Sequence, residues 1–185
     1  ETRLKILSQV AQALVFLHSN KVVHRDLKSN NVLLARPIED GVVPEAKVAD
    51  VGLAGWCDGG SEGTLMMSEG LMVVPPDRYW HAPEWGAGGA AWPVDSYAFG
   101  TLLLEVASRQ WLRRDLLLEV LTMPVPEMVI PELIGLLCSA RPLLRPTADV
   151  LVGELARLTP KDGEDAQGFY EGVWEAAKQR CKGQQ

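Results

Sequence analysis

Positions along the first part of the chain alternate in polarity with the period of a helix. Spacings of three and four residues separate the positions on one face, which are Leu4, Leu7, Ala11, Leu14 and His18. This spacing places them on one side of an α-helix. The pair Ser19-Asn20 follows and is typical of a helix end. The pattern therefore predicts a helix that ends near residue 20.

Short apolar runs flank a polar stretch directly after this helix. The runs are Val22-Val23 and Val32-Leu33-Leu34, and they predict two short strands around a functional loop. Two prolines and Asp40-Gly41 predict a turn within residues 36–45. A third brief strand is predicted at residues 46–49.

The remainder of the chain is predicted to be helical apart from one long loop. Residues 50–76 show no periodicity and are rich in Gly, Ser and Met, which is typical of a functional or disordered loop. Residues 94–109 are apolar nearly all round, and they predict a buried helix. Further helices are predicted at residues 112–121, 131–138, 147–158 and 167–180. The sum is a mostly helical body with a few short strands around one loop.

Composition and charge narrow the class of protein. The 185 residues carry a formal net charge of -6, and 47% of them are hydrophobic and 23% charged. These values are typical of one soluble globular domain. The acidic balance argues against nucleic acid and anionic membranes as partners, because both require a basic surface. No apolar run reaches the length of a membrane span.

The number and spacing of the cysteines indicate whether the protein belongs to a reducing or an oxidising compartment. Cys57, Cys138 and Cys181 are widely separated, and no pair has the spacing of metal ligands. A disulfide framework is therefore not expected. This usage favours a reducing, intracellular compartment, and we expect a cytoplasmic location.

The polar stretch between the two apolar runs carries the candidate chemistry. It reads His24-Arg25-Asp26-Leu27-Lys28-Ser29-Asn30-Asn31. Asp26 offers a proton acceptor, Lys28 a cation and Asn31 a neutral metal ligand. Phosphoryl transfer requires these parts in one place, because it depends mostly on positioning and charge stabilisation. A second carboxylate, Asp50, precedes Val51-Gly52, where the chain can turn sharply.

Five motifs occur in a fixed order along the chain. They are His24-Arg25-Asp26 with Asn31, Asp50-Val51-Gly52, Ala82-Pro83-Glu84, Asp95 with Phe99-Gly100, and Arg145-Pro146. In this order they resemble the protein kinase family. Lys28 followed by Ser29 resembles the tyrosine-kinase-like group of serine/threonine kinases.

The resemblance covers about residues 1–158 and implies a mainly α fold. This fold is the C-terminal lobe of a protein kinase, a helical bundle with short β-strands around the catalytic loop. Residues 159–185 are then expected to form a helical tail. The sequence holds neither the glycine-rich loop nor the strand lysine of the other lobe. We therefore expect the N-terminal lobe elsewhere in a longer parent chain, and no useful activity from this segment alone.

The resemblance implies a role for each residue of the site. Asp26 would orient the substrate hydroxyl and accept its proton, and Lys28 would neutralise the transferring phosphoryl group. Asn31 and Asp50 would hold the Mg²⁺ ions that bridge the phosphates of ATP. Leu33 would lie beneath the adenine. The implied partners are ATP and a protein substrate.

Five further residues have structural roles in the family pattern. His24 would pack against the Asp-x-Gly turn, and Arg25 would pair with a phosphate added to the activation loop. Asp95 would cap the backbone of the catalytic loop. Glu84 and Arg145 would form a buried ion pair between the end of the activation segment and the last helices.

Three departures from the family pattern bear on activity. Val51 stands where Phe is usual, so packing of the turn would lose about 1 kcal/mol. Asp77 stands where these kinases usually have a Thr that bonds the catalytic Asp and Lys, and it would add a carboxylate beside Asp26. About forty residues separate Glu105 from Arg145, so the helical subdomain that docks substrates is expected to be short.

Other conspicuous residues are expected to be structural or regulatory. Core or interface packing is expected for the tryptophans, which are Trp56, Trp80, Trp85, Trp92, Trp111 and Trp174. His18 and His81 have no partner at metal spacing, and His18 is expected to end a helix. Ser61, Thr64 and Ser68 lie in the Gly-rich loop, where a phosphate could be captured by the motif arginine.

Three functional classes are compatible with this sequence. The leading interpretation is a serine/threonine protein kinase that transfers the γ-phosphoryl group of ATP to a protein hydroxyl. The alternative is a pseudokinase, a kinase-fold scaffold or binding module without phosphotransfer, which Val51 and Asp77 favour. The third class is a helical interaction domain with chance motif matches. A glycine-rich loop, a strand Lys and a helix Glu upstream would favour the enzyme.

Overall fold

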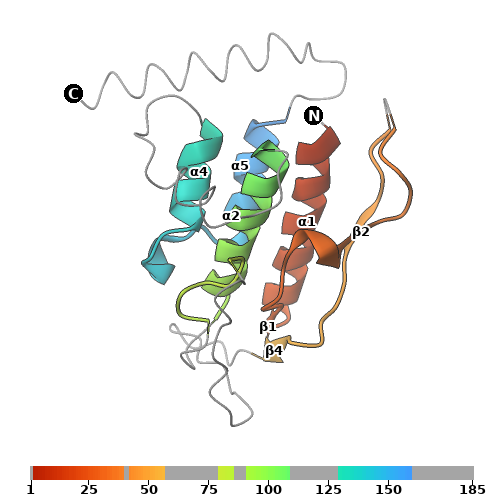
Figure 1. Ribbon diagram of the computed structural model, residues 1–185. Coiled ribbons are helices and arrows are strands. Elements are labelled where there is room, and N and C mark those ends of the chain that lie inside the picture. Colours follow the sequence, from red (N-terminus) through yellow and green to blue (C-terminus); the bar gives the residue numbers. More distant parts are fainter. Residues whose placement is uncertain (1, 40–41, 57–78, 86–90, 109–128, 160–185) are drawn as a thin grey trace, which may run out of the picture.

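The computed structural model describes residues 2–39, 42–56, 79–85, 91–108 and 129–159. Within these ranges the body consists of helices α1 (Thr2–Ser19), α2 (Pro93–Ser108), α4 (Val129–Leu137) and α5 (Ala148–Arg157). Figure 1 shows these helices side by side, with α2 between α1 and α4. The prediction of a mostly helical body is confirmed for the described part of the chain.

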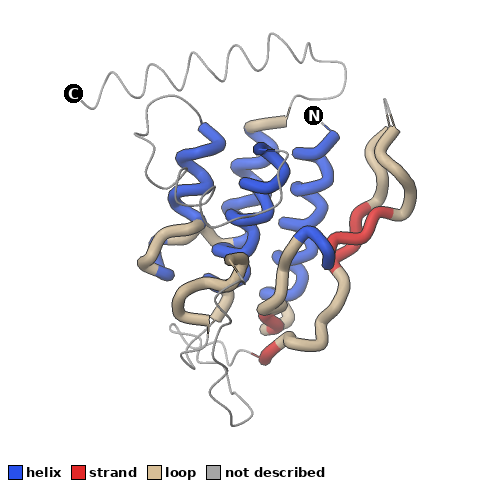
Figure 2. Tube along the Cα trace, viewed as in Figure 1, coloured by secondary structure: helices blue, strands red, loops and turns tan. Residues whose placement is uncertain are grey.

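The strands are short and lie outside the helical body, as the red segments of Figure 2 show. Strand β2 (Val32–Leu34) pairs antiparallel with β3 (Ala46–Val48), and Val32 lies opposite Val48. Strand β1 (Val22–Val23) pairs antiparallel with β4 (Gly55–Trp56). The sequence predicted loop where β4 forms. This prediction was wrong because the strand depends on its partner β1 rather than on a local apolar pattern.

The apolar face predicted for the first helix lies in the core. Residues Ile6, Leu7, Val10, Ala11 and Leu14 of α1 are buried. This face packs against α5, whose Leu151 and Leu155 are fully buried. The predicted positions at the two ends of the helix, Leu4 and His18, are only half-buried. The spacing of apolar residues thus identified the buried side of α1 but not how far toward each end of the helix the burial reaches.

Helix α2 is buried around its whole circumference over residues 93–104. Its Phe99 and Leu103 side chains are fully inaccessible. A Cβ atom added at Gly100 would lie 2.6 Å from Leu137 Cβ and 2.9 Å from Cys138 Sγ. Helix α4 and the residue after it therefore approach α2 closely at Gly100, which is possible because glycine has no side chain. The prediction of a buried helix in this region is confirmed.

Other sequence predictions fall partly or wholly outside the described residues. The helices predicted at residues 131–138 and 147–158 correspond to α4 and α5. Those predicted at residues 112–121 and 167–180 lie outside the described residues. Among the helices that can be described, none has the length and apolar character needed to cross a bilayer.

A buried ion pair links the segment before α2 to the last helices. Arg145 donates to both carboxylate oxygens of Glu84, and its Nη2 lies 3.0 Å from Glu84 Oε2. The arginine also donates to the carbonyl oxygens of Ser139 at 2.9 Å and Pro93 at 3.0 Å. Its side chain is fully buried, whereas that of Glu84 is 24% exposed. The guanidinium group thus holds three chain segments together at the start of α2.

Replacing Arg145 by Ala is expected to destabilise the protein by about 3 kcal/mol, because it leaves the Glu84 carboxylate and two carbonyl groups without their donor. Thermal and urea unfolding of the two proteins measure this difference. A matched control is Arg157→Ala, which removes an exposed ion pair with Glu154 and should change stability by less than about 0.5 kcal/mol. Equal unfolding curves for Arg145→Ala and the wild-type protein would show that the pair carries no stability.

Candidate functional site

The loop of residues 24–31 is held in place by hydrogen bonds to one carboxylate in the first turn of α2. Asp95 accepts hydrogen bonds from the backbone amides of His24 and Arg25, both at 2.8 Å. A third donor is Nε2 of His18, at the end of α1, which lies 2.9 Å from Asp95 Oδ2. Asp95 is fully buried, and Arg25 adopts a left-handed backbone with a φ of 69°. Non-glycine residues rarely adopt this conformation, so the hydrogen bonds to Asp95 help to maintain it.

The imidazole of His24 joins this loop to the strand that precedes Asp50. Its Nε2 donates to the carbonyl oxygen of Ala49 at 3.0 Å, and its Nδ1 accepts from the backbone amide of Asp26 at 3.3 Å. An imidazole with its proton on Nε2 satisfies both bonds. His24 therefore lies beneath the turn that contains Asp50.

Four side chains donate to the carboxylate of Asp26, which is 5% exposed. Oδ2 accepts from Lys28 Nζ at 2.6 Å and Asn31 Nδ2 at 3.3 Å. Oδ1 accepts from Trp80 Nε1 at 2.9 Å and His81 Nε2 at 3.3 Å. Both oxygens therefore have two donors.

The pKa of Asp26 reflects a competition between burial and these donors. Burial alone would raise its pKa, since it penalises the charged form. The hydrogen bonds from Lys28, Trp80 and His81, together with the charge of Lys28, outweigh that effect and hold the pKa of Asp26 below its ordinary value. Asp26 is therefore ionised at neutral pH and able to accept a proton.

Asn31 and Asp50 are brought near one another by the pairing of β2 with β3. Asn31 ends the short 3-10 helix η1 (Ser29–Asn31), and its Nδ2 donates to the carbonyl oxygen of Asp26 at 2.8 Å. The amide of Ala49, next to Asp50, donates to the carbonyl oxygen of Asn31 at 2.8 Å. Asp50 is exposed and has a left-handed backbone with a φ of 61°. The two side chains that could supply oxygen ligands thus belong to adjacent chain segments.

Arg25 and two aromatic rings form a stack beside the loop. The Arg25 guanidinium lies 5.0 Å from the centroid of the Trp85 ring, and Trp85 Nε1 donates to the Arg25 carbonyl oxygen at 2.7 Å. His81 stacks on Trp85 with a centroid distance of 4.3 Å and an interplanar angle of 4°. Burial lowers the pKa of Arg25, an effect that the nearby charge of Asp95 partly offsets.

Leu33 and Val51 are both largely exposed. Leu33 is 54% exposed on one face of β2, whereas its neighbours Val32 and Leu34 point the other way, as alternation along a strand requires. Val51 is 56% exposed. Val51 was expected to pack against the turn less tightly than a Phe would. In the structure its side chain faces solvent, so it contributes little buried contact to the turn.

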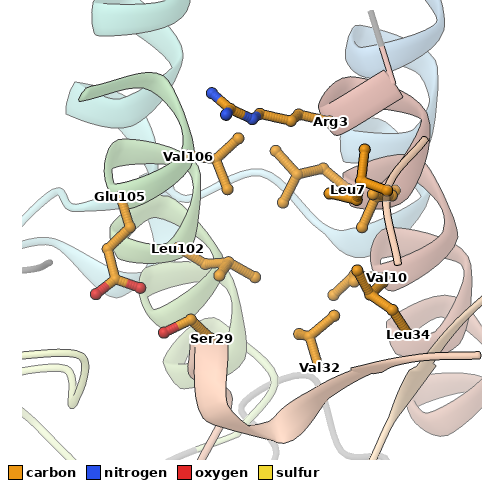
Figure 3. A pocket seen from close by; sticks show the side chains of 11 residues that line it. Arg3, Leu7, Val10, Ser29, Val32, Leu34, Leu102, Glu105 and Val106 are labelled. Carbon is orange, nitrogen blue, oxygen red and sulfur yellow. The ribbon is translucent and has the colours of Figure 1, made fainter. Parts of the chain in front are cut away.

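A cavity of about 450 Å³ is lined by Ser29 of the loop and by residues of α1, α2 and β2. Figure 3 shows its apolar lining between α1, α2 and β2, with Arg3 and Glu105 among the polar residues around it. The apolar lining residues include Leu7, Val10, Val32, Leu34, Leu102 and Val106. Neither Asp26 nor Lys28 lines it, so the cavity is not where the polar residues of the loop converge.

Sequence reasoning missed four residues that contact the site. Trp80, Trp85 and His81 were expected to be packing or isolated residues, and His18 only to end a helix. Their contacts join positions far apart in the chain, for example Trp80 with Asp26 and His18 with Asp95. The only local signal was that Trp80 and His81 directly precede the Ala82-Pro83-Glu84 motif. Asp77, Ser61, Thr64 and Ser68 lie outside the described residues.

Comparisons with known proteins point to one family. The sequence model of the family described as "Protein kinase domain" matches residues 1–117. A Dictyostelium discoideum protein named "Probable serine/threonine-protein kinase" is 39% identical over 101 residues, which are 54% of this chain and 18% of that protein. The cysteine-rich receptor-like protein kinase 41 of Arabidopsis thaliana is 37% identical over 110 residues, covering 57% of this chain and 15% of that protein.

A third relative matches over more of the chain. The cyclic GMP-binding protein C of Dictyostelium discoideum is 32% identical over 177 residues, which are 86% of this chain and 6% of that protein. The chain therefore spans at most 18% of the length of these three relatives.

Replacing Asp95 by Asn is expected to destabilise the protein by about 2 kcal/mol. The amide has one acceptor oxygen in place of two, so its NH₂ group would face a buried N–H donor. Urea unfolding measures the change. Asp149→Asn is the matched control, because Asp149 also lies in the first turn of a helix but is exposed. If the two variants lost equally little stability, the buried bonds to the loop would not contribute as described.

Proposed function

The chain belongs to the protein kinase family, and on that premise we propose that it carries the catalytic loop of a serine/threonine protein kinase. The proposed reaction transfers the γ-phosphoryl group of ATP to the hydroxyl of a protein substrate. The described residues would form the C-terminal lobe of this enzyme. The hydroxyl class is supported by the name of the first Dictyostelium relative and by Lys28 beside Asp26.

The observation that carries this proposal is the contact of Asp26, Lys28 and Asn31 within one loop anchored by Asp95. Oδ2 of Asp26 contacts both Lys28 and Asn31. In the proposed reaction the substrate hydroxyl approaches this carboxylate, which orients the hydroxyl and accepts its proton. Asp26 is ionised at neutral pH, so it can accept a hydrogen bond from the hydroxyl. The donors that lower its pKa hold the carboxylate in place but also weaken it as a base.

Lys28 is proposed to stabilise the phosphoryl group during transfer. Its side chain is 26% exposed, so the ammonium group can reach a substrate while it remains bonded to Asp26. A cation beside the reacting oxygen atoms compensates the negative charge of the three equatorial oxygens.

Asn31 and Asp50 are proposed to hold Mg²⁺. The Asn31 nitrogen donates to Asp26, so its amide oxygen faces the opposite way, as a ligand would require. Among the described residues, no cluster of three or more His, Cys, Asp or Glu could bind a metal. A pair of oxygen ligands nevertheless fits Mg²⁺, which binds one or two protein groups together with nucleotide phosphates and water. When bound, the ion would neutralise phosphate charge. Leu33, exposed on the outer face of β2, is proposed to contact the adenine.

A scaffold or binding module without phosphotransfer is the second candidate. The exposure of Val51 favours it, because the turn after Asp50 is not anchored by packing of that side chain. Such a module would keep the contacts around Asp26 as structural bonds, and the wild-type protein would show no phosphotransfer.

Asp26→Asn and Asp50→Asn, each made in the complete protein, test the proposal. Asp26→Asn removes the proton acceptor and is expected to lower kcat at least about a hundredfold. Asp50→Asn removes a charged metal ligand and should raise the Mg²⁺ concentration needed for transfer. Transfer of labelled phosphate from ATP to a protein substrate measures both effects.

Asp149→Asn serves as the control, since that exposed carboxylate lies on α5, outside the loop, and transfer should stay at the wild-type rate. Circular dichroism verifies the fold of every variant. No transfer by the wild-type protein would favour the binding module, whereas wild-type transfer by Asp26→Asn would overturn the role proposed for Asp26.

A further inference from the structure

Trp80 and His81 make contacts with the proposed catalytic residues that the family motifs do not include. Both residues lie in the described segment just before Ala82-Pro83-Glu84, and both donate to Oδ1 of Asp26. We propose that Trp80 and His81 are positioning residues that set the orientation of Asp26 and Lys28 for phosphoryl transfer. This inference rests on the proposed kinase function.

The division of donors between the two oxygens fixes the direction of the carboxylate. A carboxylate group turns readily about the bond to its Cβ, because this torsion has broad minima. With Trp80 and His81 bonded to Oδ1, rotation would break two hydrogen bonds to a charged acceptor. Oδ2 is thereby kept toward Lys28, the side at which the reacting hydroxyl would arrive.

Trp80 contacts both members of the proposed catalytic pair. Its Nε1 donates to Asp26, while Lys28 Nζ lies 5.2 Å from the centroid of its ring. The face of an indole attracts an ammonium group. A single side chain therefore orients the base by its N–H group and the cation by its ring.

His81 is itself held in place by the loop that it supports. It is 6% exposed and stacks on Trp85, and Trp85 donates to the carbonyl oxygen of Arg25, the residue before Asp26. The imidazole is thus fixed between Trp85 and Asp26. A donor whose ring is already immobilised loses little conformational entropy when it orients the carboxylate.

His81→Phe and His81→Gln separate the hydrogen bond from the stacked ring. Phe retains an aromatic ring beside Trp85 but has no donor, whereas Gln can place its amide nitrogen near the position of Nε2. In the complete protein, His81→Phe is expected to lower kcat about tenfold, with KM for ATP changed by less than about twofold. His81→Gln should restore kcat to within about threefold of the wild type.

Trp80→Phe and Trp80→Leu separate the N–H group from the ring face. Trp80→Phe loses only the donor to Asp26 and should lower kcat about tenfold. Trp80→Leu also loses the surface beneath Lys28 and should lower kcat further, by about threefold. Trp92→Phe is the matched control, because Trp92 lies in a separate cavity lined by α1 and the start of α5; its kcat should equal that of the wild type.

The outcomes distinguish this inference from the proposed function. Suppose that the wild type is active, that Asp26→Asn is inactive, and that His81→Phe and Trp80→Phe both keep the wild-type kcat. This result would overturn the positioning role and leave the kinase function standing. Equal losses in His81→Phe and His81→Gln would also overturn the role of His81, since the stacked ring rather than the donor would then matter. A wild-type protein without phosphotransfer would overturn both proposals.

Discussion

The carboxylate of Asp95 lies fully buried at the start of α2 and accepts hydrogen bonds from two consecutive amides of the loop of residues 24–31. A buried carboxylate is costly unless donors surround it. Here the donors come from the loop and from His18 at the end of α1, so the cost of burial is offset only when these segments meet. The position of Asp26 depends on this arrangement, because the loop bends through the left-handed Arg25 directly before it. The buried helix and this loop therefore form one structural unit.

Much of this unit could be predicted from the sequence, because its signals are local. A segment that is apolar nearly all round indicated the buried helix α2, and the spacing of apolar residues along α1 indicated the buried side of that helix. The contacts of Trp80 and His81 could not be predicted in this way. The bond from Trp80 reaches Asp26 across 54 residues, and the bond from His81 reaches it across 55. The pairing of β4 with β1 is also a long-range contact. Such contacts follow from the packing of the whole chain, which a pattern of neighbouring residues does not encode.

The surroundings of Asp26 bear on the departure found at position 77. The sequence resemblance places Asp77 where the family pattern has a threonine donor, and Asp77 lies outside the described residues. Indole and imidazole N–H groups a few residues later donate to the carboxylate of Asp26. Both are stiff aromatic groups, in contrast to a freely rotating hydroxyl. The chain thus has donors to Asp26 whose directions are set by ring packing.

The position of the loop also depends on Gly100, which lies in the core where α2 and α4 approach closely. Any side chain at this position would overlap Leu137 and Cys138, and α2 would have to move away from α4. The same helix carries Asp95, five residues earlier, so a displacement of α2 would also displace the acceptor that holds the loop. In evolutionary terms, a constraint on the position of this loop would therefore extend to Gly100 in the core. Among descendants of this sequence, replacement of the glycine would require compensating changes at Leu137 or Cys138 if the loop is to keep its position.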